Sequence, residues 1–203
     1  MKKMILNFTK VASLLFLLLN VVVAQASDSP AADIKGVIEQ VRKEIEASKA
    51  NPDAVAVDDK LKRIIIPMFD FAEMSKRSLG SNWPKISETE QKEFVVLFSD
   101  LLSSTYLKRI KSGVQASNIK SMTDSIEGEK ALVKSIVALD GDDFSMDYRL
   151  INQSGAWKIY DVVIENVGLV GNYRSEFSDI IKKDGFPGLM QKLKNKQIAG
   201  IKK

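Results

Sequence analysis

The side chains able to do chemistry in this chain are limited to carboxylates, lysine, tyrosine and serine. The 203 residues include no histidine and no cysteine. Their absence excludes His-based acid–base catalysis, Ser-His-Asp and Cys-His nucleophiles, and zinc sites built on His or Cys. The remaining catalytic option is Asp147 or Asp161 acting with Tyr148 or Tyr160, if an apolar pocket raised the pKa of the carboxyl. No spacing of these residues requires that option, and we therefore expect no enzymatic activity.

The first residues have the features of an export signal. Lys2, Lys3 and Lys10 form a positive leader before the apolar run 11–24, and Ala24-Gln25-Ala26 offers a cleavage site before Ser27. The alternative is a retained membrane anchor, but a spanning helix needs about 20 apolar residues and this run is shorter. The sequence predicts a signal peptide at 1–26 and a single domain at 27–203.

The net charge argues against a nucleic-acid partner. The chain has 30 basic and 26 acidic residues. Three of the basic residues and none of the acidic ones lie in 1–26, which leaves 27 against 26 in the remainder. Nucleic-acid binding would call for a basic patch or stripe, and the body of the chain has no such block.

Without cysteine, the exported domain must be held together by its apolar core and not by disulfides.

Hydrophobic periodicity predicts helices at both ends of the domain. Apolar residues recur at a spacing of three or four, and the clearest helix opens with the capping box Ser87-Glu-Thr-Glu90. Asp33 is expected to begin the first helix, and Gly185-Phe-Pro-Gly188 to break the last one. The predicted helical segments are 34–45, 53–66, 69–79, 87–110, 173–181 and 189–193.

Between the helices the pattern changes to a period of two. Segments 119–126, 131–139, 144–151 and 157–164 are separated by short turns, which predicts a four-stranded antiparallel meander. The last strand is apolar on both faces. Strict alternation would place Trp157, Ile159 and Val163 on one face and Tyr160, Val162 and Ile164 on the other. The predicted fold class is α+β, with the sheet packed against N-terminal and C-terminal helices.

The apolar surface has two interpretations. The long helix and the sheet could mesh into an ordinary solid core. Alternatively, they could fail to close and leave an apolar cavity, as is common for ligand sites. Methionines are compatible with both, because methionine fills irregular spaces; those in question are Met68, Met74, Met122 and Met146. Periodicity cannot decide between the two.

One stretch resembles a known family. The segment from Trp157 to Phe177, WKIYDVVIENVGLVGNYRSEF, is similar to the toluene-tolerance family, the periplasmic phospholipid-binding components of the Mla (maintenance of lipid asymmetry) pathway. Phe69-Asp-Phe71, Tyr106 and Asp147-Tyr148-Arg149 also fit, and the resemblance covers about residues 34–195. Gly168 departs from it, since serine is more usual there.

The resemblance implies a soluble periplasmic phospholipid carrier, with no cofactor and no metal. Family members move lipid between an outer-membrane lipoprotein–porin complex and an inner-membrane ABC transporter, which maintains outer-membrane lipid asymmetry. Acyl chains would lie in an apolar pocket between sheet and helices, with the headgroup near solvent, and a monomer is expected. The competing hypotheses are a protein-interaction module without a lipid ligand and the carboxylate–tyrosine enzyme on a cone-shaped α+β fold.

Three groups of site residues follow from this combined interpretation. Those expected to contact lipid tails are Phe94, Leu97, Phe98, Leu101, Val133, Val137, Met146, Tyr148, Val162 and Ile164. Those expected near the headgroup are Lys108, Arg109 and Arg149. Asp161 and Arg174 are expected to form a structural ion pair between the last strand and the helix that follows.

Overall fold

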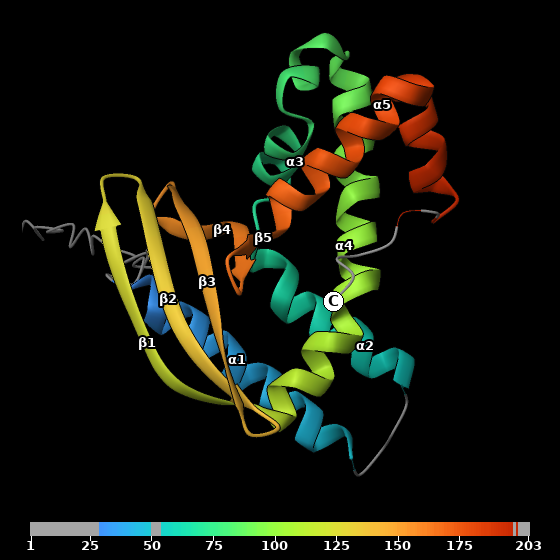
Figure 1. Ribbon diagram of the computed structural model, residues 1–203. Helices are drawn as coiled ribbons and strands as arrows, with labels where there is room; N and C mark the ends of the chain where they lie inside the picture. The colour runs from blue at the N-terminus through green and yellow to red at the C-terminus, as the bar shows by residue number, and fades with distance from the viewer. Residues whose placement is uncertain (1–28, 50–53, 197, 199–203) are drawn as a thin grey trace, which may run out of the picture.

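The computed structural model describes residues 29–49, 54–196 and 198. The predicted signal peptide at 1–26 lies outside these residues. Helices precede and follow a single antiparallel sheet (Figure 1). The helices are α1 (Pro30–Ser48), α2 (Ala54–Ile65), η1 (Ile66–Met68), α3 (Phe71–Leu79), η2 (Gly80–Lys85), α4 (Glu88–Ala116) and α5 (Leu169–Lys194). The strands are β1 (Asn118–Glu127), β2 (Lys130–Leu139), β3 (Asp142–Gln153), β4 (Ala156–Ile164) and β5 (Val167–Gly168).

The α+β class is confirmed, but the predicted count of four strands is wrong. The sheet has five strands in the order β1-β2-β3-β4-β5. The fifth is only two residues long and pairs with the end of β4. Glu165 and Asn166 form the turn between them, with φ angles of 48° and 67°. A two-residue strand carries no detectable alternation, so the sequence pattern could not reveal it.

Three helix boundaries differ from the prediction by four residues or more, and one of them is the end of α4, at Ala116 instead of Ile110. The first helix begins at Pro30, where Ser29 accepts a hydrogen bond from the Ala32 amide, and not after Asp33. Serine followed by proline is a common helix start, because proline needs no amide partner in the first turn. The C-terminal helix begins at Leu169 and runs to Lys194, with the expected break at Gly185, whose φ is 71°.

A β-bulge overturns the predicted faces of β4. Arg149 of β3 lies opposite Asp161, whereas Leu150 lies opposite Ile159, so Tyr160 is an extra residue. The extra residue reverses the alternation. The side chains of Trp157, Ile159, Val162 and Ile164 therefore share one face of the sheet. We call it the inner face, because it packs on α1.

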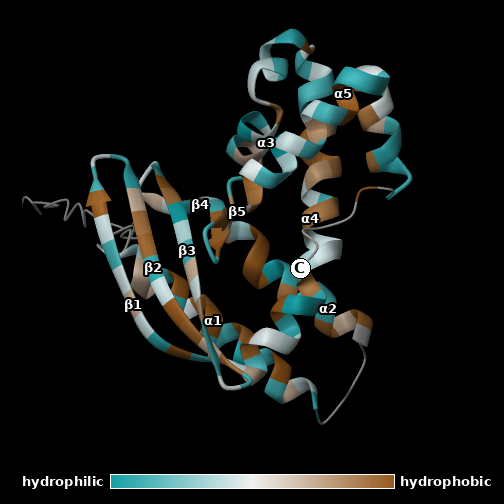
Figure 2. Ribbon diagram, in the orientation of Figure 1, coloured by the Kyte–Doolittle hydropathy of each residue, from teal (hydrophilic) through white to brown (hydrophobic). Residues whose placement is uncertain are grey.

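Contacts with α1 define the inner face and a sheet cluster. Apolar residues of α1, β2, β3 and β4 meet there with little or no exposure to solvent. In Figure 2 β2 has long apolar stretches, whereas polar residues interrupt the apolar ones along β3, as expected where a strand is covered on one face. The sheet cluster consists of Ala31, Ile34, Ala131, Val133, Leu150, Trp157 and Ile159.

The N-terminus of α1 is attached to the sheet by Asp124 of β1. The Ser29 hydroxyl donates a 2.6 Å hydrogen bond to the Asp124 carboxylate, and the Ala31 amide donates one of 3.0 Å. These two bonds lower the pKa of Asp124 below its ordinary value of 3.8. A carboxylate at a helix N-terminus is also favoured by the helix dipole.

Replacing Asp124 with alanine is expected to destabilise the fold in a pH-dependent way. Because the folded pKa is depressed, the ionised carboxylate stabilises the folded state above about pH 4 and this contribution is lost as the pH falls through the folded value. The carboxyl is largely exposed, so the loss at pH 7 should be small, under about 1 kcal/mol. Urea unfolding of the wild type and D124A at pH 7 and pH 3 measures it. A difference that grows at pH 3 would contradict this assignment.

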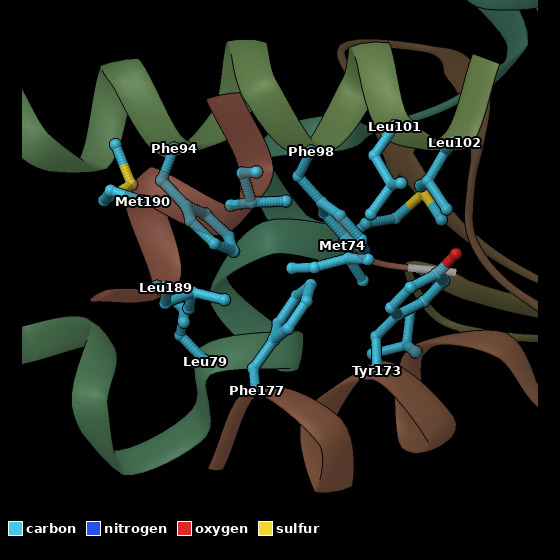
Figure 3. Packing of buried hydrophobic residues seen from close by; sticks show 13 residues of the cluster. Met74, Leu79, Phe94, Phe98, Leu101, Leu102, Tyr173, Phe177, Leu189 and Met190 are labelled. Carbon is cyan, nitrogen blue, oxygen red and sulfur yellow. The ribbon is translucent and has the colours of Figure 1, made fainter. Parts of the chain in front are cut away.

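A second cluster, the helical cluster, holds α3, α4 and α5 together (Figure 3). Its centre is aromatic. Phe98 makes edge contacts with Tyr173 and Phe177, with ring centroids 5.2 and 5.3 Å apart, and Phe94 makes one with Phe177 at 5.6 Å. All four side chains are fully buried. The buried members are Met74, Leu79, Phe94, Phe98, Leu101, Leu102, Val170, Tyr173, Phe177, Leu189, Met190, Leu193 and Ile198.

A third cluster lies at the opposite end of α4. It joins α1, α2 and the C-terminal half of α4 through Val41, Ile45, Val57, Leu61 and Leu107. The 29 residues of α4 span about 44 Å, so this one helix connects the two helical regions. In Figure 1, α3 and α5 lie at one end of α4 and α2 lies at the other.

Candidate functional site: an apolar cavity between sheet and helices

A cavity of about 420 Å³ lies where the three clusters meet. Helices α1, α2, α3 and α4 and the inner face of the sheet supply most of its wall, and η1 and the first residue of α5 also contribute. The sheet side of the wall is formed by side chains that share the inner face; six of them are Val137, Phe144, Met146, Tyr148, Val162 and Ile164. Apart from two cations, two tyrosines, two serines and one glycine, the wall is built from aliphatic, methionine and phenylalanine side chains.

Half of the residues expected to contact a ligand line this cavity. These are Val137, Met146, Tyr148, Val162 and Ile164. They share the inner face because β2 and β3 alternate regularly and the bulge brings the end of β4 into phase with them.

The other half lie elsewhere, and their assignment is corrected. Phe94, Phe98 and Leu101 belong to the helical cluster, and Leu97 packs against it. Val133 is fully buried in the sheet cluster. The prediction treated the apolar face of α4 as one surface. In the structure, its N-terminal half faces α3 and α5 and only the part from Leu102 onward reaches the cavity.

Residues of α1, α2 and the end of α4 also line the cavity, although none of them was predicted as a tail contact. On α1 the residues Ile34, Val37, Ile38 and Val41 line the cavity. Their spacing of three and four was recognised as helical, but periodicity cannot distinguish a core contact from a cavity wall. On α4 the lining residues continue the same spacing through Leu102, Tyr106, Ile110 and Gly113.

The polar groups of the cavity wall are not arranged for proton transfer. The Tyr148 hydroxyl donates to the Met146 sulfur at 3.0 Å, and burial raises the pKa of Tyr148 to about 12. Asp147 and Asp161 do not line the cavity. Asp161 lies opposite Arg149 and Asp147 lies opposite Val163, and these are positions of the outer face. The predicted carboxylate–tyrosine pairs therefore do not come together in the wall of this cavity.

The predicted ion pair between Asp161 and Arg174 is wrong. The Asp161 carboxylate, 4% exposed, accepts from the Val170 amide at 3.0 Å and from an Arg149 Nη at 3.1 Å. Arg174 instead donates from its Nε to the Arg77 carbonyl at 2.7 Å. The α5 helix has no side-chain cap of its own, because its N-cap is Gly168. Asp161 of the neighbouring strand takes over that role.

Replacing Asp161 with asparagine is expected to lower the free energy of unfolding by about 1–3 kcal/mol, the usual cost of leaving buried donors poorly paired. The R149Q variant should lose less, under about 1 kcal/mol, because the Arg149 side chain is 50% exposed. Chemical denaturation of both variants measures the difference. D147N, two residues from Arg149 on the same face, is the matched control, and an effect there equal to that of D161N would contradict the capping role.

Only one of the three residues expected near a headgroup borders the cavity. Arg109 lines it, whereas Lys108 is exposed on α4 outside the lining. Arg149 pairs with Asp161 on the outer face of the sheet, and its assignment is therefore corrected.

Two further findings concern metal ligands and membrane-spanning helices. Within the described residues, no group of three or more acidic residues is placed to hold a metal ion. None of the helices in the part of the chain that the structure describes is long and apolar enough to cross a membrane.

Comparison with known proteins identifies the family. The family model described as MlaC protein matches residues 35–195. The chain is 24% identical over 170 residues to the toluene tolerance protein ttg2D of Pseudomonas putida, covering 79% of this chain and 76% of that protein. It is 23% identical over 183 residues to the intermembrane phospholipid transport system binding protein MlaC of Haemophilus influenzae, covering 84% and 83%.

A solved structure agrees with these sequence matches. The phospholipid-binding protein from Ralstonia solanacearum, in complex with a phospholipid, superposes with a TM-score of 0.70 at 25% identity. The match covers 82% of this chain and 96% of that one. Since the family model spans most of the domain, and the fold agrees over the same region, this chain belongs to the MlaC protein family.

Proposed function

We propose that this protein is a periplasmic phospholipid carrier that holds acyl chains in the cavity between the sheet and the helices. The observation that carries the proposal is the cavity itself, with a wall almost free of polar groups. Membership of the MlaC family and the phospholipid in the Ralstonia solanacearum relative support it. Five of the ten residues expected to contact lipid tails line this cavity.

The physical requirement for such a carrier explains the lack of chemistry in the site. Each methylene removed from water contributes about 0.8 kcal/mol. Two chains with roughly 30 methylenes together would thus resist leaving a membrane by on the order of 20 kcal/mol. A carrier must offer an apolar environment of comparable quality. Polar wall groups left unpaired against a chain would cost about 1–3 kcal/mol each.

The finer parts of the proposal concern location and partners. We infer that residues 1–26 direct export to the periplasm and are removed. There the carrier would exchange lipid with an outer-membrane lipoprotein–porin complex and an inner-membrane ABC transporter, which would maintain the lipid asymmetry of the outer membrane. A carrier of this kind would act as a monomer.

Lipid analysis of the native protein tests the proposal. The protein is purified without detergent or denaturant, extracted with organic solvent and analysed by mass spectrometry. About stoichiometric phospholipid is expected. A protein free of lipid that also takes up none from labelled vesicles would instead favour the interaction module without a ligand.

A further inference from the structure

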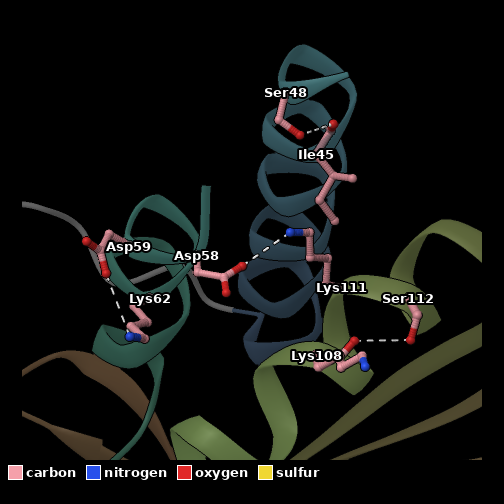
Figure 4. Close-up of polar contacts among 8 residues, drawn as sticks. All are labelled: Ile45, Ser48, Asp58, Asp59, Lys62, Lys108, Lys111 and Ser112. Atoms are coloured by element: carbon pink, nitrogen blue, oxygen red, sulfur yellow. Dashed lines mark hydrogen bonds and ion pairs between the residues drawn. The ribbon is translucent and has the colours of Figure 1, made fainter. Parts of the chain in front are cut away.

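The cavity ends where its wall meets packed clusters of side chains. On the side of α1 and α2 it is bordered by Val41 and Leu107, which belong to the third cluster. The ion pair of Lys111 with Asp58, at 3.2 Å, holds α4 against α2 on this side (Figure 4). On the side of α3 and α5 the cavity is bordered by the helical cluster. An acyl chain in the cavity therefore meets packed side chains in both directions.

Met74 of α3 lies at the boundary between the cavity and the helical cluster. Its side chain is fully buried, and it both lines the cavity and belongs to that cluster. Leu102 of α4 shares this double membership and is 5% exposed. In Figure 3 Met74 lies among the labelled residues of the cluster, on the same side as Leu102. These two side chains separate the cavity from the interior of the cluster.

The helical cluster beyond this boundary is tightly packed. The ring centroid of Phe98 lies 5.2 Å from that of Tyr173 and 5.3 Å from that of Phe177, and all three side chains are fully buried. None of these three rings lines the cavity. Interlocked rings in a close-packed core have little freedom to move aside, whereas methionine is unbranched and adapts to the space around it. The extent of the cavity on this side therefore depends on the Met74 side chain.

Exposure along the wall shows which parts of the cavity open to solvent. Ile66 of η1 and Val167 of β5 line the cavity and are 36% and 48% exposed, whereas Met74 has no exposed surface. A lipid that keeps its polar end in water directs the ends of its chains towards the buried part of the wall, because that is where methylenes leave water most completely. Met74 is therefore placed to meet the end of a chain and not the headgroup.

We propose that Met74 closes the cavity against the helical cluster and sets the longest acyl chain that the protein accepts. The inference rests on the proposed carrier function, because it requires acyl chains in this cavity. A chain that reaches Met74 can become no longer without displacing a packed cluster. Each methylene left without an apolar place lowers the affinity by about fourfold, so this one position can discriminate between chains that differ by about two carbons.

The M74A variant tests this inference. It removes the side chain beyond Cβ and leaves room for about two to three methylenes, because a hole made in an apolar core stays dry and takes up apolar ligands. The purified protein is incubated with vesicles of phosphatidylglycerol whose saturated chains range from about 14 to 20 carbons in equal amounts, and the bound lipid is analysed by mass spectrometry. Relative to the wild type, M74A should favour chains longer by about two carbons by on the order of tenfold.

Two other methionines provide matched controls. M190A removes the same side chain from the helical cluster, where Met190 is 7% exposed and outside the cavity lining. It should lower the stability and leave the preferred chain length unchanged. M122A removes the same side chain from the wall on β1, where Met122 is half-buried. It enlarges the cavity without moving the end at the helical cluster, so it should also keep the wild-type preference.

The remaining measurements separate the possible outcomes. Circular dichroism and thermal unfolding check the fold, and M74V, a smaller reduction at the same position, should shift the preference less and in the same direction. It takes the place of M74A if that variant does not fold. An unchanged preference in folded, lipid-loaded protein, or an equal shift in M122A or M190A, would overturn the inference and leave the carrier function intact. A wild type that takes up phospholipid of no chain length would refute the carrier function itself.

Discussion

Replacing Val137 with glutamate is expected to remove most of the bound phospholipid from the purified protein. Val137 lies in β2 on the inner face, between Ile119 and Phe144 of the neighbouring strands, and all three line the cavity. A carboxylate there would either face acyl chains unpaired or draw water into the cavity, and either costs several kcal/mol. We expect at least about a tenfold drop in phospholipid per protein, measured by mass spectrometry of the extracted lipid.

The control for this variant is its neighbour on the same strand. Ile136 points to the outer face, opposite Ser145, and is 37% exposed. The I136E variant adds the same charge to the same strand but leaves the cavity wall unchanged, so it should keep its lipid. If I136E and V137E lost lipid equally, the charge of the strand and not the cavity would be responsible. If neither lost lipid, the ligand would lie elsewhere and the proposed function would be refuted at this site.

Replacing Phe98 with alanine is expected to have the opposite pattern: a large loss of stability with little change in lipid content. Phe98 is fully buried in the helical cluster, in contact with the rings of Phe94, Tyr173 and Phe177. Phenylalanine-to-alanine changes in such cores lower the free energy of unfolding by about 3–5 kcal/mol, because the transfer energy is lost and a hole remains. Urea unfolding at 25 °C measures the change, and lipid is quantified in the folded fraction.

Val96 supplies the matched control, since it lies two residues away on α4 and is 60% exposed. The V96A variant should change the free energy of unfolding by less than about 0.5 kcal/mol. A loss of lipid in F98A as large as that in V137E, without a matching loss of folded protein, would return Phe98 to the ligand site where the sequence analysis had put it.

Local signals were enough to predict most of the secondary structure. The capping box at the start of α4 is present as predicted: the Ser87 amide and hydroxyl donate to the Glu90 carboxylate, and the Glu90 amide donates to the Ser87 hydroxyl. The four longer strands agree with the predicted segments to within two residues at each end. These features depend on side chains a few residues apart, so a linear pattern contains the information that specifies them.

The predictions of strand faces and of ion-pair partners were wrong, because they depend on contacts between elements far apart in the sequence. The alternation along β4 gave no sign that Tyr160 forms a bulge, and one extra residue moves every later side chain to the other face. Asp161 was expected to pair with Arg174, but the register of β3 and β4 brings Arg149 beside it. Such contacts depend on where separate elements lie in three dimensions, which their individual patterns do not encode.

The sequence by itself determined the α+β class, the helices and the longer strands, and the resemblance to the family that the comparisons then identified. Only the tertiary structure decided which apolar side chains fill a core and which border an empty space. Phe98 and Val137 cannot be told apart in the sequence, since each is an apolar residue at the expected period of its helix or strand. Removal from water stabilises both. The difference arises from the packing of α1, α2 and α4 against a bulged sheet, where the helices leave room beside Val137 and none beside Phe98.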